Sequence, residues 1–409
     1  MTTSPIRQEI ENHWAGLLTP PHSPLRAKLA ERVFRLAVRT LPVRVVLPGG
    51  ERLGAGGDDA PVMRIVRPEA FFHRLGVDAK IGFGEAYMVG DWTSADPAAT
   101  LTPFAARLAT LVPRPLQVLR RWVDARRPDD ERNTVEGARS NIHRHYDLSN
   151  DLFAAFLDET MTYSSAWFAE TDDLPAAQRR KIDGILDYAG VRQGSTVLEI
   201  GTGWGGLAVE AARRGATVTT LTISPEQKRL ADKRIAEAGV ADRVTVQLCD
   251  YRVATGTYDA VVSVEMIEAV GEQYWPAYFG TLDRLLAPGG AIALQAITMP
   301  HDRLLATRHS HTWITKYVFP GGQLLSVPEI ERQVGALPGM RITGRRRLGG
   351  HYARTLHQWR ERFTEQSAYV TELGFDQVFH RLWEFYLAYS EAGFRSGYLD
   401  VWQLRMTRG

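Results

Sequence analysis

The chain has 409 residues, a formal net charge of +2 and a single cysteine, Cys249. One cysteine excludes an intramolecular disulfide and a cysteine-rich metal cluster, and no metal site is predicted. No apolar run approaches the roughly 18 residues needed to span a bilayer, and the first residues lack the apolar core of an export signal. A cytoplasmic protein of two or three domains is therefore expected.

Basic residues gather in two stretches near the N-terminus. Residues 25–45 carry six basic side chains against Glu31 alone, and residues 103–128 carry six against Asp124 alone. The first stretch also has apolar residues at helical spacing, namely Leu25, Leu29, Val33 and Leu36. This pattern predicts a basic amphipathic helix, which either lies on anionic lipid or packs on the protein with a solvated basic face. No zinc-finger, basic-zipper or RNP-type motif is present, so nucleic acid is not an expected partner.

Residues 1–130 are expected to form a small α+β domain of their own. Short strand-like pieces, "VRVVL" at 43–47 and "MRIV" at 63–66, alternate there with Gly- and Pro-rich turns. The polar, proline-bearing stretch "RRPDDERNT" (126–134) is typical of a linker. A second domain is therefore expected over residues 131–409.

The second domain alternates predicted strands with predicted helices. After a helical, aromatic stretch from Asn141 to Glu170, strands are predicted at 196–200, 216–223, 243–249, 258–264 and 291–297. Helices are predicted near 206–214, 225–238, 273–286, 355–366 and 375–392, with a last strand at 398–406. Such alternation predicts a parallel α/β sheet. A parallel sheet completed late by an antiparallel strand is typical of class I methyltransferases, whereas a dinucleotide dehydrogenase continues with a second mononucleotide-binding half.

A glycine-rich turn, "EIGTGWGG" (199–206), joins the first strand of this sheet to the first helix. The spacing alone suits either a dinucleotide or S-adenosylmethionine, because any tight strand-to-helix turn needs small residues. An NAD site would place a carboxylate at the end of the second strand, but Thr222 and Ser224 stand there. Trp204 would also crowd a pyrophosphate at the helix N-terminus.

S-adenosylmethionine suits the strand ends better. Glu199 supplies a carboxylate at the end of the first strand, and Gly201 and Gly203 let the backbone approach the amino-acid part of the ligand. Asp250 and Tyr251 follow the third strand, with an acceptor and an aromatic face for adenine. Each residue also has a structural alternative: an ion pair or cap for Glu199, a turn for Asp250, core packing for Tyr251. Because ligands of open α/β sheets bind at this edge, the sequence predicts S-adenosylmethionine as the cofactor.

Five separated motifs occur in order: "HYDLSNDLFAAFLDETMTYSSAWF" (145–168), "VLEIGTGWGGLA" (197–208), "VSVEMIEAVG" (262–271), "KYVFPGGQLLS" (316–326) and "HYARTLHQWRERF" (351–363). Together they resemble the cyclopropane-fatty-acyl-phospholipid synthase family, which includes the mycolic acid cyclopropane synthases. The resemblance implies a class I methyltransferase Rossmann-like sheet with a helical lid, and methyl transfer from S-adenosylmethionine to a cis double bond of a fatty acyl chain. The first domain, with "IGFGEAYMVGDW" at 81–92, resembles the N-terminal module of the bacterial phospholipid enzymes.

The resemblance also assigns residues to the cofactor site. The positions that would line S-adenosylmethionine are Tyr163, Ser164, Gly201, Gly203, Thr222, Ile223, Gln227 and Tyr251. Glu199 and Asp250, from the strand-end argument, complete this predicted set.

In this family a bicarbonate ion serves as the base, held by five groups of the protein. Three of the groups match here as Glu268, Tyr352 and the backbone of Ile297, whereas Ser165 stands at the cysteine position and Gln295 at the histidine position. Serine and glutamine can also donate hydrogen bonds to an anion, so bicarbonate is included among the expected ligands.

A further departure is Glu265, which stands where the relatives carry glycine. It adds a carboxylate one helical turn from Glu268. Two carboxylates in a dry pocket repel each other and raise the pKa of one, which would make a base or a proton donor. The alternative is that Glu265 points to solvent.

Methyl addition to an alkene leaves a carbocation, which a dry site with aromatic faces stabilises. Motif position favours Tyr317 and Tyr352 for this role. Loss of a proton then closes a cyclopropane ring or, after a hydride shift, leaves an exocyclic methylene. The motif set, with "MPHDR" at 299–303, resembles the actinobacterial methyltransferases that make 10-methylene-stearoyl chains for tuberculostearic acid. A 10-methylene product is therefore expected, with a cyclopropane ring as the alternative.

The expected partner is a phospholipid with an unsaturated acyl chain. The basic stretches, joined by Arg345, Arg346 and Arg347, would dock a peripheral enzyme on the inner membrane face, and the resemblance implies a homodimer. Two other classes stay open from the sequence: an NAD-dependent oxidoreductase and a non-catalytic lipid-binding relative.

Overall fold

The computed structural model describes residues 14, 16–108, 110–111 and 149–409. Contacts divide the chain into two compact units. Unit 1 comprises Met1–Arg127, His309–Val318 and Leu356–Tyr398, and unit 2 comprises Pro128–Arg308, Phe319–Thr355 and Leu399–Gly409. His309–Val318 and Leu356–Tyr398 therefore belong to unit 1 together with the N-terminal residues. The sequence had placed both segments in the second domain, with a single boundary at residue 130. The predicted linker, the second basic stretch beyond residue 111 and the motif residues before 149 lie outside the described residues.

Unit 1 contains a four-stranded sheet of order β2-β1-β3-β4. Its strands are β1 (Arg44–Val46), β2 (Arg52–Leu53), β3 (Val62–Ile65) and β4 (Trp92–Thr93). β1 pairs in parallel with β3 and antiparallel with β2, and β3 pairs antiparallel with β4. The predicted strands at 43–47 and 63–66 are confirmed as β1 and β3.

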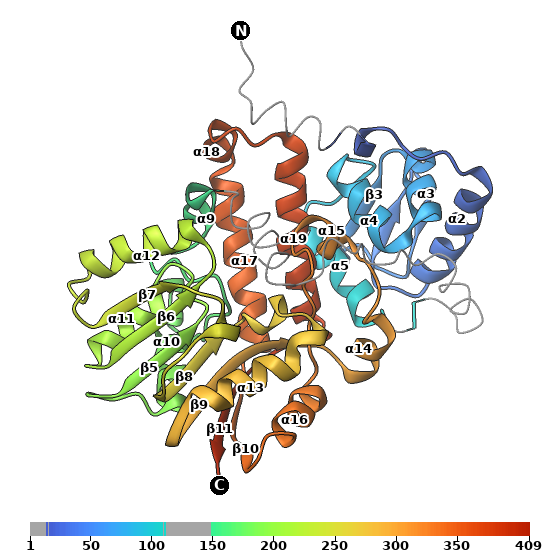
Figure 1. The fold of residues 1–409 in the computed structure, drawn as a ribbon. Helices are drawn as coiled ribbons and strands as arrows, with labels where there is room; N and C mark the ends of the chain where they lie inside the picture. Colours follow the sequence, from blue (N-terminus) through green and yellow to red (C-terminus); the bar gives the residue numbers. More distant parts are fainter. Residues whose placement is uncertain (1–13, 15, 109, 112–148) are drawn as a thin grey trace. The chain divides into compact units, whose positions relative to one another are not determined.

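Helices form the rest of unit 1 (Figure 1). They are α2 (Pro24–Val38), α3 (Pro68–Val77), α4 (Ala79–Met88), α5 (Pro97–Ala106), α15 (Trp313–Tyr317), α18 (Ser367–Glu372), α19 (Gln377–Arg395) and the C-terminal part of α17 (Gly349–Glu365). The predicted basic helix is α2, which ends at Val38, so that Arg44 lies on β1 instead. α2 buries Phe34 edge-to-face against Phe71 of α3, with the ring centres 5.3 Å apart.

Unit 2 is built on a seven-stranded sheet of order β10-β11-β9-β8-β5-β6-β7. Its strands are β5 (Thr196–Ile200), β6 (Thr217–Thr222), β7 (Val244–Leu248), β8 (Tyr258–Val264), β9 (Leu286–Thr298), β10 (Met340–Arg347) and β11 (Asp400–Arg408). Strands β5 to β9 pair in parallel, and β11 runs antiparallel to both β9 and β10. This is the class I methyltransferase arrangement predicted from the sequence, with β10 as a strand that the sequence did not reveal.

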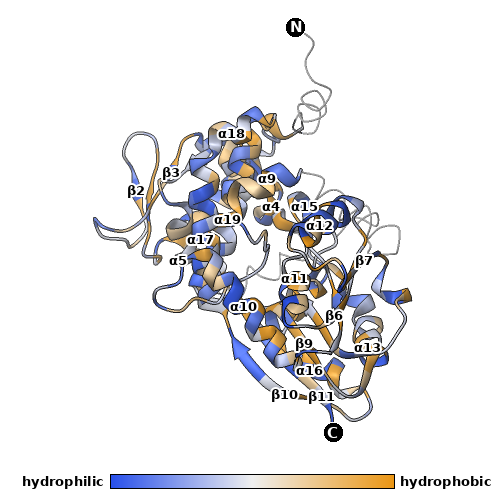
Figure 2. Cartoon of the chain, turned by 90° about the vertical axis from the view of Figure 1, so that its left-hand side faces the viewer, coloured by the Kyte–Doolittle hydropathy of each residue, from blue (hydrophilic) through white to orange (hydrophobic). Residues whose placement is uncertain are grey.

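Helices cover both faces of this sheet (Figure 1). They are α9 (Asn150–Phe156), α10 (Leu174–Ala189), α11 (Gly206–Arg213), α12 (Pro225–Glu237), α13 (Trp275–Leu285), α14 (His301–Thr307) and α16 (Val327–Gly335). Apolar residues of α10 and α11 pack on one face, and those of α13 and α16 pack on the other. Because both faces are buried, the central strands are apolar on both sides, as Figure 2 shows for β9.

Local signals explain where the helices of unit 2 begin and end. The Asp173 side chain caps α10 by accepting from the Ala176 amide at 2.8 Å, and Gly190 ends the helix in the left-handed conformation. Ser224 caps α12 by accepting from the Gln227 amide at 3.2 Å. The helical pattern expected from Asn141 to Glu170 is wrong in its later part, because residues 157–173 form no helix.

The arginines of β10 do not form the free basic cluster that the sequence suggested. Arg345 pairs with Glu331 and Arg347 with Asp400. Arg346 stacks over the Trp167 ring, 4.1 Å from its centre. Their charges are therefore used within unit 2, and β10 is the hydrophilic edge of the sheet (Figure 2).

Candidate active site

The glycine turn after β5 has the conformation that the sequence predicts. Gly201 has φ +102° and Gly203 has φ +51°, which side-chain-bearing residues rarely adopt. A Cβ atom at Gly203 would meet open space, whereas one at Gly201 would lie 3.3 Å from the Met266 side chain. The turn thus leaves room for a ligand beside Gly203 and lies close to the segment that follows β8.

The end of β6 carries a buried pair of polar side chains. The Thr222 hydroxyl donates to Oε1 of Gln227 at 2.8 Å, and the Ser224 amide donates to the Thr222 hydroxyl. Because the Gln227 side-chain oxygen already accepts a hydrogen bond from Thr222, the NH2 group of Gln227 is left to donate to ribose oxygens of a ligand. Ile223 lies between them, partly buried.

The end of β7 places Asp250 and Tyr251 next to each other. The Asp250 carboxylate caps η2 (Tyr251–Val253) and forms an ion pair with Arg252 at 2.6 Å. The Tyr251 ring packs edge-on against Tyr278, and burial raises the pKa of its hydroxyl to about 12. Asp250 therefore has a structural role as a cap, with both carboxylate oxygens bonded to Arg252, and its contact with adenine stays a prediction.

Tyr163 and Ser164 lie in the irregular segment between α9 and α10. The Tyr163 ring packs against Phe153. The Ser164 hydroxyl accepts from Nζ of Lys181 at 2.6 Å, and the Ser164 carbonyl accepts from the Gln178 amide at 3.0 Å. Two buried residues of α10, Gln178 and Lys181, thus fix the backbone and side chain of a predicted cofactor residue.

Glu199 is buried at the end of β5, where its carboxylate accepts from the Thr220 hydroxyl at 2.6 Å. Burial raises its pKa to about 8, while the Thr220 hydrogen bond and the charge of Lys181 act in the opposite direction. Since Lys181 is itself buried, its pKa falls to about 8. The two groups thus shift each other's titration beneath the ligand edge of the sheet.

These strand ends fit S-adenosylmethionine. The carboxyl ends of β5, β6 and β7 are adjacent, because the Gly201 amide donates to Leu221 and the Cys249 amide donates to Thr222. The edge therefore combines a glycine turn with open space, a carboxamide donor and an acidic residue beside an aromatic ring. Among the described residues, no group of three or more His, Cys, Asp or Glu side chains is arranged to hold a metal ion.

The structure brings together five of the six predicted catalytic residues in unit 2, around two carboxylates. Glu265 follows β8 and does not point to solvent: its Oε1 accepts from the Ser165 amide at 2.9 Å and from the Gln295 side chain at 2.7 Å. Tyr352 is also hydrogen-bonded to the Glu265 carboxylate. Burial raises the pKa of Glu265, while these donors and the charge of Lys181 lower it.

Glu268 lies on η3 (Ile267–Ala269), where its Oε1 accepts from the Ile297 amide at 2.5 Å. The residue as a whole is partly exposed, but its other oxygen, Oε2, is buried with no hydrogen-bond partner among the described residues. Burial, followed by the charge of Glu265, raises the pKa of Glu268 to about 8. The charge of Glu265 thus favours the protonated form of Glu268.

The donors expected for bicarbonate are engaged within the protein. The Ile297 amide bonds Glu268, and the Gln295 amide and Tyr352 bond Glu265. The Ser165 hydroxyl donates to the Ala166 carbonyl at 3.0 Å. A bicarbonate ion does not fit this arrangement, because it would have to displace a carboxylate from its own donors.

Tyr317, the sixth predicted catalytic residue, lies in unit 1. Its hydroxyl donates to Glu85 at 2.7 Å, and its ring contacts Trp14 and Trp313. Burial raises the pKa of this hydroxyl. The described contacts thus tie Tyr317 to Glu85 of α4, and its catalytic role stays a prediction.

Two functional candidates escaped the sequence analysis. Lys181 occupies the buried face of α10 with Ala177 and Ile185, and a lysine on an apolar helical stripe is the signal that could have revealed it. Gln403 of β11 donates to Oε1 of Gln295 at 3.0 Å. No spacing rule links Gln403 to the site, because only the pairing of β11 with β9 brings it there.

The fold and the strand edge define a class I S-adenosylmethionine-dependent methyltransferase. The solved structure of the cyclopropane synthase MmaA2 from Mycobacterium tuberculosis is 31% identical, with a TM-score of 0.61 over 66% of this chain and 97% of its own. The mycolic acid cyclopropane synthase CmaA1 complexed with SAH and CTAB is 30% identical, with a TM-score of 0.61 over 68% of this chain and 98% of its own.

The sequence family is equally clear. The model of the mycolic acid cyclopropane synthetase family matches residues 133–404, and the chain belongs to this family. Over 97% of the chain and 96% of the relative, it is 52% identical to the tuberculostearic acid methyltransferase UfaA1 of Mycobacterium tuberculosis. It is 32% identical to the cyclopropane-fatty-acyl-phospholipid synthase of Escherichia coli over 85% of the chain and 88% of the relative. An NAD-dependent oxidoreductase is thereby excluded, and the protein is a methyltransferase rather than a binding relative.

Proposed function

We propose that this methyltransferase adds a one-carbon unit to the cis double bond of an unsaturated acyl chain in a phospholipid and releases a 10-methylene chain. The observation that carries the proposal is the buried carboxylate pair, Glu265 and Glu268, beside the glycine turn. Met266, between them in sequence, lies against Gly201. A group that can accept a proton is therefore held next to the place expected for the methyl donor.

The cofactor supplies a methyl group on a positively charged sulfur. Gly201, Gly203, Thr222, Gln227 and Asp250 bind and orient it at the strand edge. The neighbouring aromatic and apolar side chains exclude water, so that a carbocation on the acyl chain survives long enough to lose a proton. Tyr352 belongs to the same cluster through its hydrogen bond to Glu265, and in this proposal its ring stabilises positive charge.

The choice of a methylene product over a ring rests on similarity along nearly the whole chain. Identity is 52% with the tuberculostearic acid methyltransferase and 32% with the cyclopropane-forming enzyme of Escherichia coli. Ser165, Gln295 and Glu265 stand where the family pattern has cysteine, histidine and glycine. These three differences alter the groups expected around the reacting carbons. A cyclopropane ring remains the alternative product.

The test is product analysis with purified protein, S-adenosylmethionine and vesicles of an oleoyl phospholipid. Gas chromatography with mass spectrometry should find acyl chains heavier by one methylene unit. Catalytic hydrogenation under mild conditions then separates the two products, because an exocyclic methylene takes up two hydrogen atoms and a cyclopropane ring does not. A ring product would support the alternative, and no product would contradict the proposal.

We also propose that helix α2 docks the enzyme on an anionic phospholipid surface. Leu25, Leu29 and Leu36 are 83%, 51% and 57% exposed in the described structure, while Phe34 and Val38 face the unit's interior. Exposed basic residues stand between the leucines, namely Arg26, Lys28 and Arg32, and exposed Arg39 follows the helix. Leucine inserts at the acyl boundary and basic side chains approach lipid phosphates.

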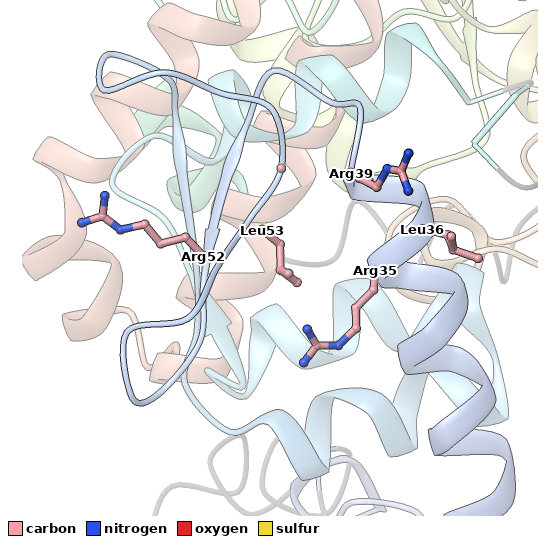
Figure 3. Close-up of a pocket in the computed structure, with 6 residues that line it drawn as sticks. Arg35, Leu36, Arg39, Arg52 and Leu53 are labelled. Carbon is pink, nitrogen blue, oxygen red and sulfur yellow. The ribbon is translucent and has the colours of Figure 1, made fainter.

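A recess of about 380 Å³ continues this surface (Figure 3). Leu36 of α2 and Arg39, which follows the helix, line one side, and Arg52 and Leu53 of β2 line the other. Arg35, also at the recess, forms ion pairs with Glu31 and Glu51. Within the part of the chain that the structure describes, Arg39 and Arg52 of this recess form no ion pair, so their guanidinium groups are the ones we propose for a lipid phosphate. None of the described helices is long and apolar enough to cross a membrane. The docking that we propose is peripheral.

The homodimer expected from the sequence stays a prediction.

Vesicle sedimentation tests this docking. The triple variant Leu25→Ser, Leu29→Ser, Leu36→Ser should lose most binding to anionic vesicles, while a control change of an exposed leucine in unit 2, Leu305→Ser, should not. Binding should weaken as salt rises and with neutral vesicles. Equal binding by the triple variant would contradict the role of α2.

A further inference from the structure

We propose that the Glu265 carboxylate is the built-in base of this active site, taking the place of a bound anion and accepting the proton that the methylated acyl chain loses. The inference rests on the proposed function and deepens it. It predicts that turnover needs no bicarbonate.

The backbone of Glu265 has a conformation that glycine ordinarily provides. Its φ is +49°, in the left-handed region that side-chain-bearing residues avoid. Such residues persist where their surroundings hold them, and they concentrate at functional sites. Gln295 holds Glu265 from two directions: its carbonyl accepts from the Glu265 amide at 2.9 Å, and its side chain donates to Oε1 at 2.7 Å.

Three donors converge on this one carboxylate: the Ser165 amide, the Gln295 amide and Tyr352. Donors of this kind hold the charged form of a carboxylate in an interior site. They are also contributed by the residues that the sequence assigned to an external anion. The Glu265 side chain thus already supplies the negative charge that these residues are arranged to hold.

A second anion would be electrostatically unfavourable here. Glu265 and Glu268 are already coupled, and the charge of Glu265 helps to raise the pKa of Glu268. The buried cation that acts on Glu265 is Lys181, whose charge also acts on Glu199 and Asp158. Adding bicarbonate to this buried cluster would bring in a further negative charge for which no second cation is recorded among the described residues.

The proton transfer balances without another reactant. The alkene π electrons form the new carbon–carbon bond to the methyl group, and the electrons of the sulfur–carbon bond stay on sulfur. After a hydride shift between the two acyl carbons, a C–H bond of the new methyl group breaks. Its electrons form the exocyclic double bond, and its proton passes to the Glu265 carboxylate, which later releases it to solvent.

The experiment compares wild type, Glu265→Gln and Glu265→Gly in decarbonated buffer and in buffer with added sodium bicarbonate. Wild-type turnover should be the same in both buffers. Glu265→Gln keeps the shape but cannot accept a proton, so its turnover should fall by about 10²- to 10⁴-fold in both. Glu265→Gly opens the anion position, so its turnover should be low without bicarbonate and rise at least about tenfold with it. Glu237→Gln, an exposed carboxylate of α12, is the matched control and should behave as wild type.

A second measurement, the Tm with and without bicarbonate, tests anion binding independently of turnover. Bicarbonate should raise the Tm of Glu265→Gly and leave that of the wild type unchanged, because a ligand that binds only the folded state stabilises it. Wild-type turnover that drops in decarbonated buffer, or Glu265→Gln that keeps full turnover, would overturn the inference while leaving the proposed function intact. A wild type that forms no methylated lipid under any condition would instead reject the proposed function.

Discussion

Nε2 of Gln403 donates to Oε1 of Gln295 at 3.0 Å, and this bond decides which way the Gln295 amide faces. With its oxygen taken by Gln403, Gln295 turns its own Nε2 toward Glu265. Gln403 is held in turn by Arg346, which donates to its oxygen at 2.9 Å. A chain of donors therefore runs from β10 through β11 and β9 to the carboxylate, and Gln403 is a positioning residue.

Replacing Gln403 with Glu should disturb this chain, because a carboxylate cannot donate to Gln295. The Gln295 amide then loses its fixed orientation, and the pKa of Glu265 rises through a weakened hydrogen bond and a new nearby charge. We expect kcat to fall about 10- to 100-fold, as for other groups that orient a catalytic one. The acid limb of the pH–rate profile should move to higher pH, with an unchanged Kd for S-adenosylmethionine by calorimetry.

The control for Gln403 is a change that affects only packing. Thr343→Ala on β10 removes an exposed side chain that meets Thr407 at 3.4 Å and should leave the profile unchanged. An acid limb at the wild-type pH in Gln403→Glu would show that Gln403 supports the sheet rather than the base.

Glu268→Gln should lower steady-state turnover by at least about tenfold and leave cofactor affinity unchanged. Glutamine still accepts the Ile297 amide, but it cannot exchange a proton with Glu265 and pass it toward solvent. The first methyl transfer should therefore proceed in a rapid-quench experiment, followed by slow later turnovers. Wild-type turnover in Glu268→Gln would remove Glu268 from the catalytic set.

The sequence predicted the strand edge better than the carboxylate cluster. Strand ends are local features, so the alternation of strands and helices was enough to place Gly201, Thr222 and Asp250 at or just after strand ends, whereas the cofactor role of Thr222 came from the family resemblance. The cluster depends on long-range pairing: Ser165 meets Glu265 across 100 positions, and Gln403 meets Gln295 across 108. A single sequence holds no record of such contacts, and for this reason the orientation of Glu265 stayed open.

Tyr317 of unit 1 and strand β10 of unit 2 illustrate the same limit. Motif position favoured Tyr317 as a catalytic group, yet tertiary contacts with Glu85 occupy its hydroxyl. The strand β10 was missed because its run of arginines has little strand character. Within the folded unit, Arg345 and Arg347 of β10 form ion pairs with Glu331 and Asp400, and Arg346 stacks on the Trp167 ring.

Lys181→Met should shift the pH dependence of kcat/KM. The positive charge of Lys181 lowers the pKa of Glu265 and of Glu199. Without it, Glu265 takes up a proton at higher pH, so the acid limb should move up by about 1 pH unit or more, as expected for loss of a close opposite charge. The exposed Lys233→Met of α12 is the control. An unshifted limb in Lys181→Met would mean that Lys181 acts only by supporting Ser164.

Glu199→Gln should make stability less sensitive to pH between 5.5 and 7.5. The pKa of Glu199 is about 8 in the folded protein and 4.5 ordinarily, so between these values the folded state holds a proton that the unfolded state has lost. Stability contributed by this group therefore falls as pH rises, by up to about 1.4 kcal/mol per pH unit for one proton. Glu268 acts with the same sign, whereas Lys181, with its pKa lowered to about 8, acts only at higher pH.

The measurement is the Tm of wild type and variant at pH 5.5 and 7.5. Wild type should lose more Tm across this interval than Glu199→Gln, and the difference between the two proteins isolates Glu199 from every other titrating group. Glutamine still accepts the Thr220 hydroxyl, so the variant should fold, and at pH 7.5 it should be the more stable of the two. Glu237→Gln should follow the wild type, since its carboxylate is exposed. Parallel pH trends in wild type and Glu199→Gln would mean that the Glu199 carboxylate is already ionised in the folded protein, with Lys181 as its counter-charge.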